Sequence, residues 1–256
     1  SDGTEGDSLT IAPGTETGTV LVCTATASDT DGSTDTGTAA ATVTNTEPVV
    51  ESVTVTPATG KVGDTLTCEA TASDADGDDP TITYAWSDGS TETTYTIAET
   101  DDPGSTITCT ATATDISGAT ATGSADATVE NTDPVMGTVS ISPDPPTNDD
   151  TLTCTATATD ADGDAPTISY TWSTGATGAM IALTSASLPG DEVTCTATAT
   201  DPSGASDVGS ATVTVRNRAP TAGTVTISPT EPAITDAVTC TATGAADPDG
   251  EEPPLT

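Results

Sequence analysis

The sequence contains no histidine and no phenylalanine, and its aromatic residues are two tryptophans and three tyrosines. Without histidine, neither a Ser-His-Asp nor a Cys-His catalytic arrangement can form. So few rings also exclude an aromatic-lined pocket in which a carboxyl group could be desolvated for general acid catalysis. The sequence therefore predicts a protein that is not an enzyme.

Basic residues are scarce as well, because three Lys and Arg stand against forty Asp and Glu, a formal net charge of -37. Charge of this sign repels nucleic acid and anionic lipid, so neither is an expected partner, whereas cations are. No apolar run approaches the roughly 20 residues that span a bilayer, so direct membrane insertion is not expected. An acidic surface also suits an extracellular protein that stays hydrated at high salt, which leaves the cause of the charge open.

The sequence does contain an internal repeat, with a period of 86 residues. Asn45-Thr46-Glu47-Pro48 returns as Asn131-Thr132-Asp133-Pro134 and, more loosely, as Asn217-Arg218-Ala219-Pro220. The cysteines follow the same period in two series: Cys23, Cys109 and Cys195, and Cys68, Cys154 and Cys240. Since only 33% of the residues are hydrophobic, we expect several thin cores rather than one large core.

Around the cysteines, apolar and polar residues alternate with the period of two that is typical of half-buried strands. Ile107, Cys109, Ala111 and Ala113 share one face of such a segment, and threonines occupy the other face. Turn signals such as Asp76-Gly77 separate these segments, and no helical period appears. The prediction is an all-β chain with about seven short strands in each repeat.

Each complete repeat also places a tryptophan between its two cysteines, as in Cys68, Trp86 and Cys109, and again in Cys154, Trp172 and Cys195. This order resembles the immunoglobulin fold. The residues 72–78 and Thr83-Tyr84-Ala85-Trp86 are similar to the PKD-like and cadherin-like repeats of large bacterial and archaeal surface proteins. The resemblance covers essentially the whole chain.

The resemblance implies tandem immunoglobulin-like β-sandwiches, each with one disulfide between strands B and F: Cys68 with Cys109, and Cys154 with Cys195. Trp86 and Trp172 are then core residues on strand C. In the chain-entropy model, a disulfide that closes a loop of this length contributes about 4 kcal/mol of stability. Disulfides persist in oxidising compartments, so the expected location is extracellular or at the cell surface.

The repeat divides the chain into four segments. Residues 45–130 and 131–216 are predicted complete repeats, residues 1–44 the C-terminal half of a repeat, and residues 217–256 the N-terminal half of one. Cys23 and Cys240 then have no partner within their own half, and an inter-repeat or intersubunit disulfide is expected for them. Two interpretations stay open: a window of a longer array, or a processed subunit whose halves complete each other head-to-tail.

Calcium is the one ligand that a motif suggests, although no cofactor is required. Aspartates at alternate positions around a glycine can wrap oxygen ligands around a hard cation. The candidate ligands are Asp74, Asp76, Asp78, Asp160, Asp162, Asp164, Asp247 and Asp249. The F–G turn residue Asp115 and the linker residue Glu47 could add ligands, as in cadherin-like repeats. The alternative is a solvated Asp-Gly turn held by its own hydrogen bonds.

These observations favour a structural protein over a binding or catalytic one. We expect a component of an extracellular filament, stalk or cell-surface fibre, with copies of itself as partners. The alternative is the adhesin or polysaccharide-binding repeat region of a larger secreted protein. Rows of threonine such as Thr155, Thr157 and Thr159 favour strands, and they are also candidate sites for O-linked glycans.

Overall fold

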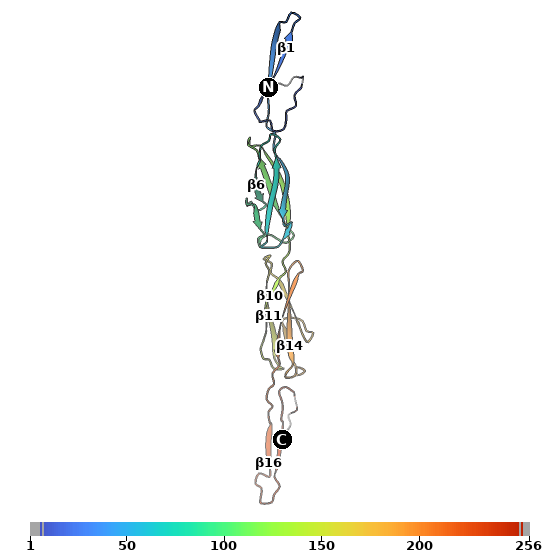
Figure 1. The fold of residues 1–256 in the computed structure, drawn as a ribbon. Helices are drawn as coiled ribbons and strands as arrows, with labels where there is room; N and C mark the ends of the chain where they lie inside the picture. Colours follow the sequence, from blue (N-terminus) through green and yellow to red (C-terminus); the bar gives the residue numbers. More distant parts are fainter. Residues whose placement is uncertain (1–5, 7, 251, 253–256) are drawn as a thin grey trace. The chain divides into compact units, whose positions relative to one another are not determined.

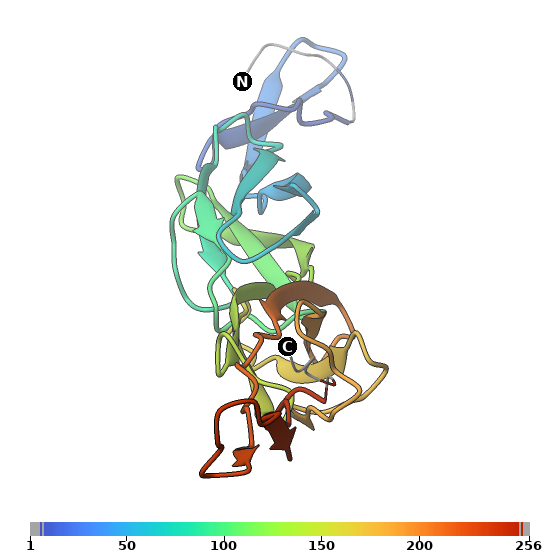
Figure 2. The ribbon, with the colours of Figure 1, turned by 90° about the horizontal axis from the view of Figure 1, so that it is seen from below.

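The structure is a computed structural model that describes residue 6, residues 8–250 and residue 252 (Figure 1). The described residues form β-strands and turns without a helix among them, as Figures 1 and 2 show from two directions. The chain divides into two compact units, Ser1–Asn131 and Thr132–Thr256. The prediction of an all-β chain is confirmed.

The first unit contains a complete β-sandwich. One sheet consists of β3 (Val49–Thr56), β5 (Thr65–Ser73) and β7 (Thr94–Thr96), and the other of β4 (Thr59–Gly60), β9 (Thr120–Val129), β8 (Thr106–Thr114) and β6 (Thr81–Trp86), each in spatial order. All neighbours are antiparallel except β4 and β9, which are parallel. Cys68 on β5 and Cys109 on β8 form a disulfide that joins the two sheets.

The core of this sandwich is built from small and aliphatic side chains. On β8, Ile107, Cys109, Ala111 and Ala113 alternate with threonines, and none of the four is more than 4% exposed. Trp86 is 3% exposed, lies opposite Cys109 in the β6–β8 register, and donates its indole N–H to the Glu92 carbonyl oxygen at 2.9 Å. The strand alternation is as predicted, and Trp86 lies within this core.

The second unit repeats this sandwich. One sheet consists of β10 (Val135–Ser142), β11 (Thr151–Thr159) and β13 (Met180–Ala182). The other sheet consists of β12 (Thr167–Trp172), β14 (Glu192–Thr200) and β15 (Ser206–Thr214). Cys154 on β11 and Cys195 on β14 form the inter-sheet disulfide. Trp172 is 4% exposed and donates its indole N–H to the Gly178 carbonyl oxygen at 2.8 Å.

The two sandwiches differ by one edge strand. Pro145 and Pro146 stand where the first sandwich has Thr59 and Gly60 of β4. Proline has no N–H group and cannot complete a strand ladder, so the second sandwich has six strands instead of seven. One contact of this edge is kept, because Pro146 still accepts a hydrogen bond from the Arg216 N–H at 2.8 Å.

Two hairpins stand outside the sandwiches. The hairpin of β1 (Val20–Ser28) and β2 (Thr34–Thr42) corresponds through the repeat to β8 and β9, and that of β16 (Thr224–Ser228) and β17 (Thr239–Thr243) to β10 and β11. Residues of these hairpins that are equivalent to core residues of the sandwiches are exposed to solvent. Ile227 is 57% exposed, whereas its equivalent Ile141 is 8% exposed. Cys23 and Cys240 are unpaired and exposed.

A tyrosine distinguishes the pH response of the two cores. Tyr95 is 8% exposed and donates its hydroxyl to Asp101 Oδ2 at 2.7 Å, and burial followed by this contact raises the pKa of Tyr95 to about 12. Since this pKa lies above the usual value of 10.0, the stability that the neutral hydroxyl contributes is complete below pH 10 and is lost as the pH rises through about 12. The equivalent residue of the second sandwich is Ile181.

We therefore expect the first sandwich to lose more stability than the second between pH 10 and pH 12. Urea unfolding followed by the single tryptophan of each sandwich would measure this, in Trp172→Phe and Trp86→Phe backgrounds. Tyr95→Phe should abolish the difference, because it removes the titrating hydroxyl. A difference of the same size in the Tyr95→Phe variant would contradict this explanation.

Candidate functional site

Three short acidic turns occur at equivalent places in the repeat: acidic turn 1 (residues 74–78), acidic turn 2 (residues 160–164) and acidic turn 3 (residues 247–250). In each, the first aspartate accepts a hydrogen bond from the backbone N–H of the second. The N–O distances are 2.7 Å for Asp76 to Asp74, 2.9 Å for Asp162 to Asp160 and 2.7 Å for Asp249 to Asp247. The glycine that follows has a positive φ in all three, so the local fold is an aspartate-glycine turn.

The second aspartate of each turn binds the linker that precedes its own repeat. Asp76 accepts the Thr46 N–H at 2.7 Å, and Asp162 accepts the Thr132 N–H at 2.6 Å. Asp249 accepts the N–H of Arg218 in the same way. The turns thus hold the linker backbone in place, a role that is not evident from the sequence.

Acidic turn 1 lies among further carboxylates of the first unit. Burial raises the pKa of Asp78, and the negative charges of Asp74, Asp76, Asp115 and Glu16 raise it further, in that order of effect. Such mutual repulsion marks a place where a cation would be stabilised electrostatically.

The loop before β1 also reaches this turn. The Thr17 hydroxyl lies 3.4 Å from Asp76 Oδ2, and the Gly14 N–H donates to the Ala75 carbonyl oxygen at 3.0 Å. Asn45 donates its side-chain amide to Asp115 Oδ2 at 2.8 Å, and this contact lowers the pKa of Asp115 more than any other. Linker, turn and preceding half-repeat therefore meet at one acidic junction.

The candidate calcium ligands come together as pairs rather than as a preformed cage. Within the part of the chain that the structure describes, no three Cys, Asp or Glu side chains lie close enough to form a metal centre. The first two aspartates of each turn are linked through the hydrogen bonds given above, while Asp78 and Asp164 lie one residue beyond the glycine. Calcium binding by these residues stays a prediction.

Acidic turns 1 and 2 contain buried carboxylate oxygens without a hydrogen-bond donor: Asp74 Oδ2, Asp160 Oδ2 and Asp162 Oδ1. Asp162 is only 7% exposed. A buried carboxylate oxygen without a donor or a cation costs free energy, so these atoms are sites at which a cation would be favourable.

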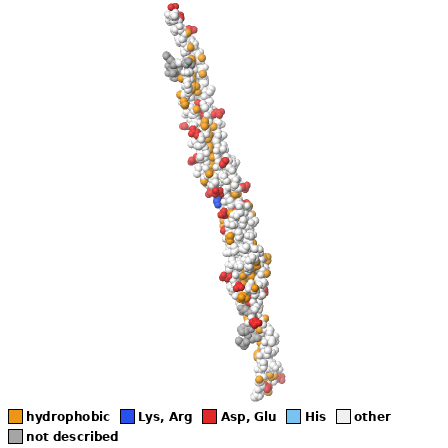
Figure 3. All heavy atoms as spheres, turned by 90° about the vertical axis from the view of Figure 1, so that its right-hand side faces the viewer, with side chains coloured by type: hydrophobic (Ala, Val, Ile, Leu, Met, Phe, Trp, Pro, Cys, Tyr) orange, Lys and Arg blue, Asp and Glu red, His pale blue; other side chains and the backbone are white. Residues whose placement is uncertain are grey.

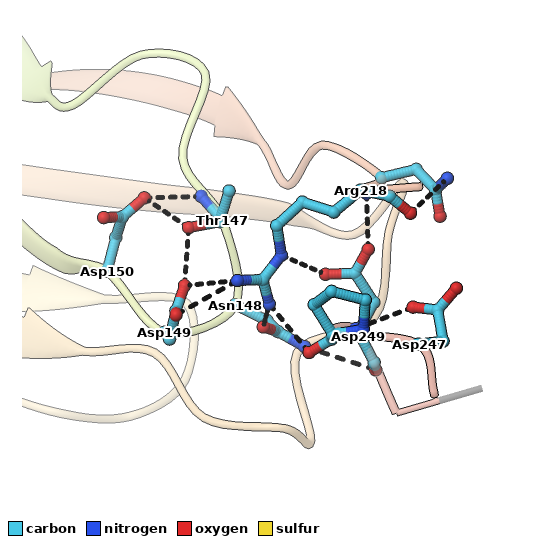
Figure 4. A network of polar contacts seen from close by, with 9 residues as sticks. Thr147, Asn148, Asp149, Asp150, Arg218, Asp247 and Asp249 are labelled. Atoms are coloured by element: carbon cyan, nitrogen blue, oxygen red, sulfur yellow. Dashed lines mark hydrogen bonds and ion pairs between the residues drawn. The ribbon is translucent and has the colours of Figure 1, made fainter. Parts of the chain in front are cut away.

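Acidic turn 3 is arranged differently, because the side chain of Arg218 lies across it (Figure 4). Arg218 Nε lies 2.9 Å from Asp249 Oδ1, and its Nη1 lies 3.0 Å from both oxygens of Asp149. Its Nη2 contacts the Asn148 side-chain oxygen and lies 2.8 Å from the Pro248 carbonyl oxygen. The guanidinium therefore joins the linker, the acidic turn and the loop before β11.

The side chains around Arg218 are held by contacts of their own. Asn148 is 3% exposed and donates to the Asp249 carbonyl oxygen at 3.3 Å, and Thr147 donates its hydroxyl to Asp149 at 2.7 Å. The backbone N–H of Arg218, followed by its side chain, lowers the pKa of Asp249. The stability that this network contributes through Asp249 is therefore fully present above the usual aspartate pKa of 3.8. It is lost as the pH falls below that value towards the lowered pKa of Asp249.

Arg218, Asn148 and Asp149 are site residues that no sequence motif predicted. One signal was available, since Arg218 is one of only three basic residues and replaces the Thr of Asn45-Thr46 and Asn131-Thr132. Acidic colour is spread over the visible face in Figure 3 and basic colour is rare there, so a guanidinium that is only 23% exposed is distinctive in this acidic protein.

Comparison with known proteins gives structural likeness without a family. No family model and no curated protein matches the sequence. The solved structure PcdhgB3 EC1-4 has 17% identity over 78% of this chain and 57% of that one, with a TM-score of 0.36. A tetra-tandem repeat from the extending region of a large adhesion protein has 19% identity over 90% of this chain and 71% of that chain, with a TM-score of 0.36. Sidekick-1 immunoglobulin domains 1–5 have 15% identity over 86% of this chain and 52% of that chain, with a TM-score of 0.34.

These TM-scores are too low to define the fold, which follows instead from the strand order and the inter-sheet disulfides described above. The chain consists of tandem immunoglobulin-like β-sandwich repeats. It spans little more than half the length of PcdhgB3 EC1-4 and of the Sidekick-1 fragment.

The two disulfides also indicate where the protein resides. Their Cα–Cα distances are both 6.4 Å, within the ordinary range for a disulfide. Such bonds persist outside the reducing cytosol, and these repeats are extracellular or at the cell surface. Among the described residues, none forms a helix that is long and apolar enough to cross a membrane.

Proposed function

We propose that these repeats are a non-catalytic structural component of an extracellular filament, stalk or cell-surface fibre. The observation that carries this proposal is the recurrence every 86 residues of the same small-residue core with an inter-sheet disulfide. A module of this kind needs no large apolar interior, because the covalent link supplies much of its stability. Repeats that contact only their neighbours suit an extended object.

The two lone hairpins support another copy of the repeat as the partner. The β1–β2 hairpin supplies strands of the F–G type with Cys23, and the β16–β17 hairpin supplies strands of the A–B type with Cys240. In the complete sandwiches, the equivalent strands cover each other and their cysteines are bonded. We infer that each hairpin is covered by the complementary strands of a neighbouring repeat, whether in the same chain or in the next subunit.

Gel electrophoresis of the native material tests this arrangement. If subunits are joined through Cys23 and Cys240, non-reducing gels will show a ladder that collapses to about 25 kDa on reduction, the mass of this chain being 24.9 kDa. If the repeats form one long chain, a single large band will persist after reduction. Fully reactive Cys23 and Cys240 thiols in the native material would contradict both forms of the proposal, because each requires these cysteines to be bonded.

The alternative role in polysaccharide binding receives less support. Sugar recognition commonly uses an exposed aromatic ring as a stacking platform. Trp86, Trp172 and Tyr95 are buried, and Tyr84 and Tyr170 are half-buried. None of the five aromatic side chains is therefore a fully exposed platform, which lowers the support for sugar recognition by these repeats.

We also propose calcium as the ligand of acidic turns 1 and 2, in support of the structural role. Their orphaned carboxylate oxygens and the repulsion around Asp78 support a hard cation with oxygen ligands. O-linked glycans are a further proposed modification of the exposed residues Thr155, Thr157 and Thr159 on β11.

A further inference from the structure

We propose that the guanidinium of Arg218 occupies the position of a divalent cation, so that acidic turn 3 needs no metal whereas acidic turn 2 binds one. This inference rests on the calcium part of the proposed function and specifies which turns are metal sites. It assigns the candidate ligands Asp247 and Asp249 to an internal cation instead of calcium.

One carboxylate oxygen has different partners in acidic turns 2 and 3. Asp162 and Asp249 are the second aspartates of acidic turns 2 and 3, and each uses Oδ2 to accept the N–H of its linker residue. Oδ1 of Asp162 is buried and has no donor. Oδ1 of Asp249 is bound by Arg218 Nε at 2.9 Å. The same oxygen is thus unsatisfied where the linker residue is Thr132 and satisfied by a positive charge where it is Arg218.

Burial makes this difference energetically important. Asp162 is 7% exposed, and the side chain of Asp249 has no exposed surface. A buried carboxylate requires a compensating charge or a full set of hydrogen bonds. Arg218 supplies both to acidic turn 3, and no hydrogen bond reaches Asp160 Oδ2 or Asp162 Oδ1 in acidic turn 2.

The chemistry of the unsatisfied atoms selects the ligand class. Two carboxylate oxygens from Asp160 and Asp162 offer hard, negatively charged ligands, which Ca²⁺ prefers, and the remaining coordination positions would be filled by water and nearby oxygens. A sequence with a net charge of -37 and only three basic side chains can supply an internal counter-cation at very few places. Acidic turn 2, whose Asp162 Oδ1 has no donor, therefore depends on an ion from solution.

The test is the number of tightly bound Ca²⁺ ions per chain, measured by equilibrium dialysis in 150 mM NaCl so that diffuse counterions are screened. Arg218→Thr recreates the linker residue of acidic turn 2, Thr132, and we expect it to bind one ion more than the wild type. Arg218→Gln should give the same gain. Asp162→Asn should bind one ion fewer than the wild type.

Two controls separate the site from general electrostatics. Arg216→Thr makes the same change in net charge at an exposed position, so it should leave the number of ions unchanged. Adding Asp249→Asn to Arg218→Thr should remove the gained ion. Trp172 fluorescence reports whether each variant retains the folded sandwich.

Hydrogen exchange in the wild type provides an independent readout. The Thr132 amide should exchange more slowly when Ca²⁺ is added. The exchange rate of the Arg218 amide should not change when Ca²⁺ or EDTA is added. An unchanged ion count in both Arg218 variants, or an Arg218 amide that responds to Ca²⁺ as strongly as that of Thr132, would overturn the proposal. That outcome would not change the disulfide ladders on gels, so the structural role is tested independently of calcium binding.

Discussion

Replacing Cys68 and Cys109 together by alanine should lower the free energy of unfolding of the first sandwich by about 4 kcal/mol. The disulfide closes a separation of 41 residues and joins the two sheets, so its loss restores the freedom of that loop in the unfolded chain. The core that remains contains Trp86, Tyr95 and a few aliphatic residues, with alanines completing one face of β8. Since native domains are stable by only about 5–15 kcal/mol, we expect this change to leave the sandwich close to unfolding.

The second sandwich provides the matched control within the same molecule. Urea unfolding in a Trp172→Phe background follows the altered sandwich through Trp86, and the converse background follows the intact one through Trp172. The midpoint should fall in the first experiment and stay unchanged in the second. A loss of less than about 1 kcal/mol would show that packing alone maintains the fold and that the disulfide contributes little to its stability.

Replacing Trp86 by alanine should be the most damaging single core substitution, with a cost of about 3–5 kcal/mol. The ring is 3% exposed, its centroid lies 5.4 Å from that of Tyr95, and its N–H is paired with the Glu92 carbonyl oxygen. A small alanine would leave both a cavity and an unpaired carbonyl group. The small neighbouring side chains could fill little of that space.

Peptide-resolved hydrogen exchange is the suitable measurement, because the variant lacks its own fluorescent reporter. Protection should fall throughout β5, β6 and β8 and remain in β11, β12 and β14. Ile116→Ala is the control, because Ile116 is 86% exposed and its truncation should have no measurable effect. Equal protection in the Trp86→Ala and Ile116→Ala variants would contradict the assignment of Trp86 as the centre of this core.

The strands and the cores could be predicted because their signal is local. The alternation of alanine, cysteine and threonine on β8 determines which face is buried without knowledge of its neighbours. The missing edge strand was also encoded, since Pro145 and Pro146 replace Thr59 and Gly60. The need for glycine at position 123 could not be predicted from the sequence. A Cβ there would lie 2.9 Å from atoms of Val50 and Val53, and this close approach arises only when β3 packs across β9.

The candidate site could be predicted only in its local part. The acidic turns were located from Asp-x-Asp-Gly spacing, and their internal hydrogen bonds follow from that spacing. Their contacts with the linkers join residues about 30 positions apart, and Arg218 reaches Asp149 across 69 positions. Such contacts depend on how the folded hairpins and loops meet, so no short-range pattern could reveal them.

The placement of the disulfide has a mechanical consequence. If the proposed fibre is stretched until a sandwich opens, the residues between Cys68 and Cys109 will remain looped and bear no tension. At about 3.5 Å per extended residue, an opened repeat can lengthen to roughly 160 Å, compared with roughly 300 Å for the same repeat in reduced form. Oxidation would thus set the extensibility of the proposed fibre, and a reductant would soften it by nearly doubling the length to which each opened module can extend.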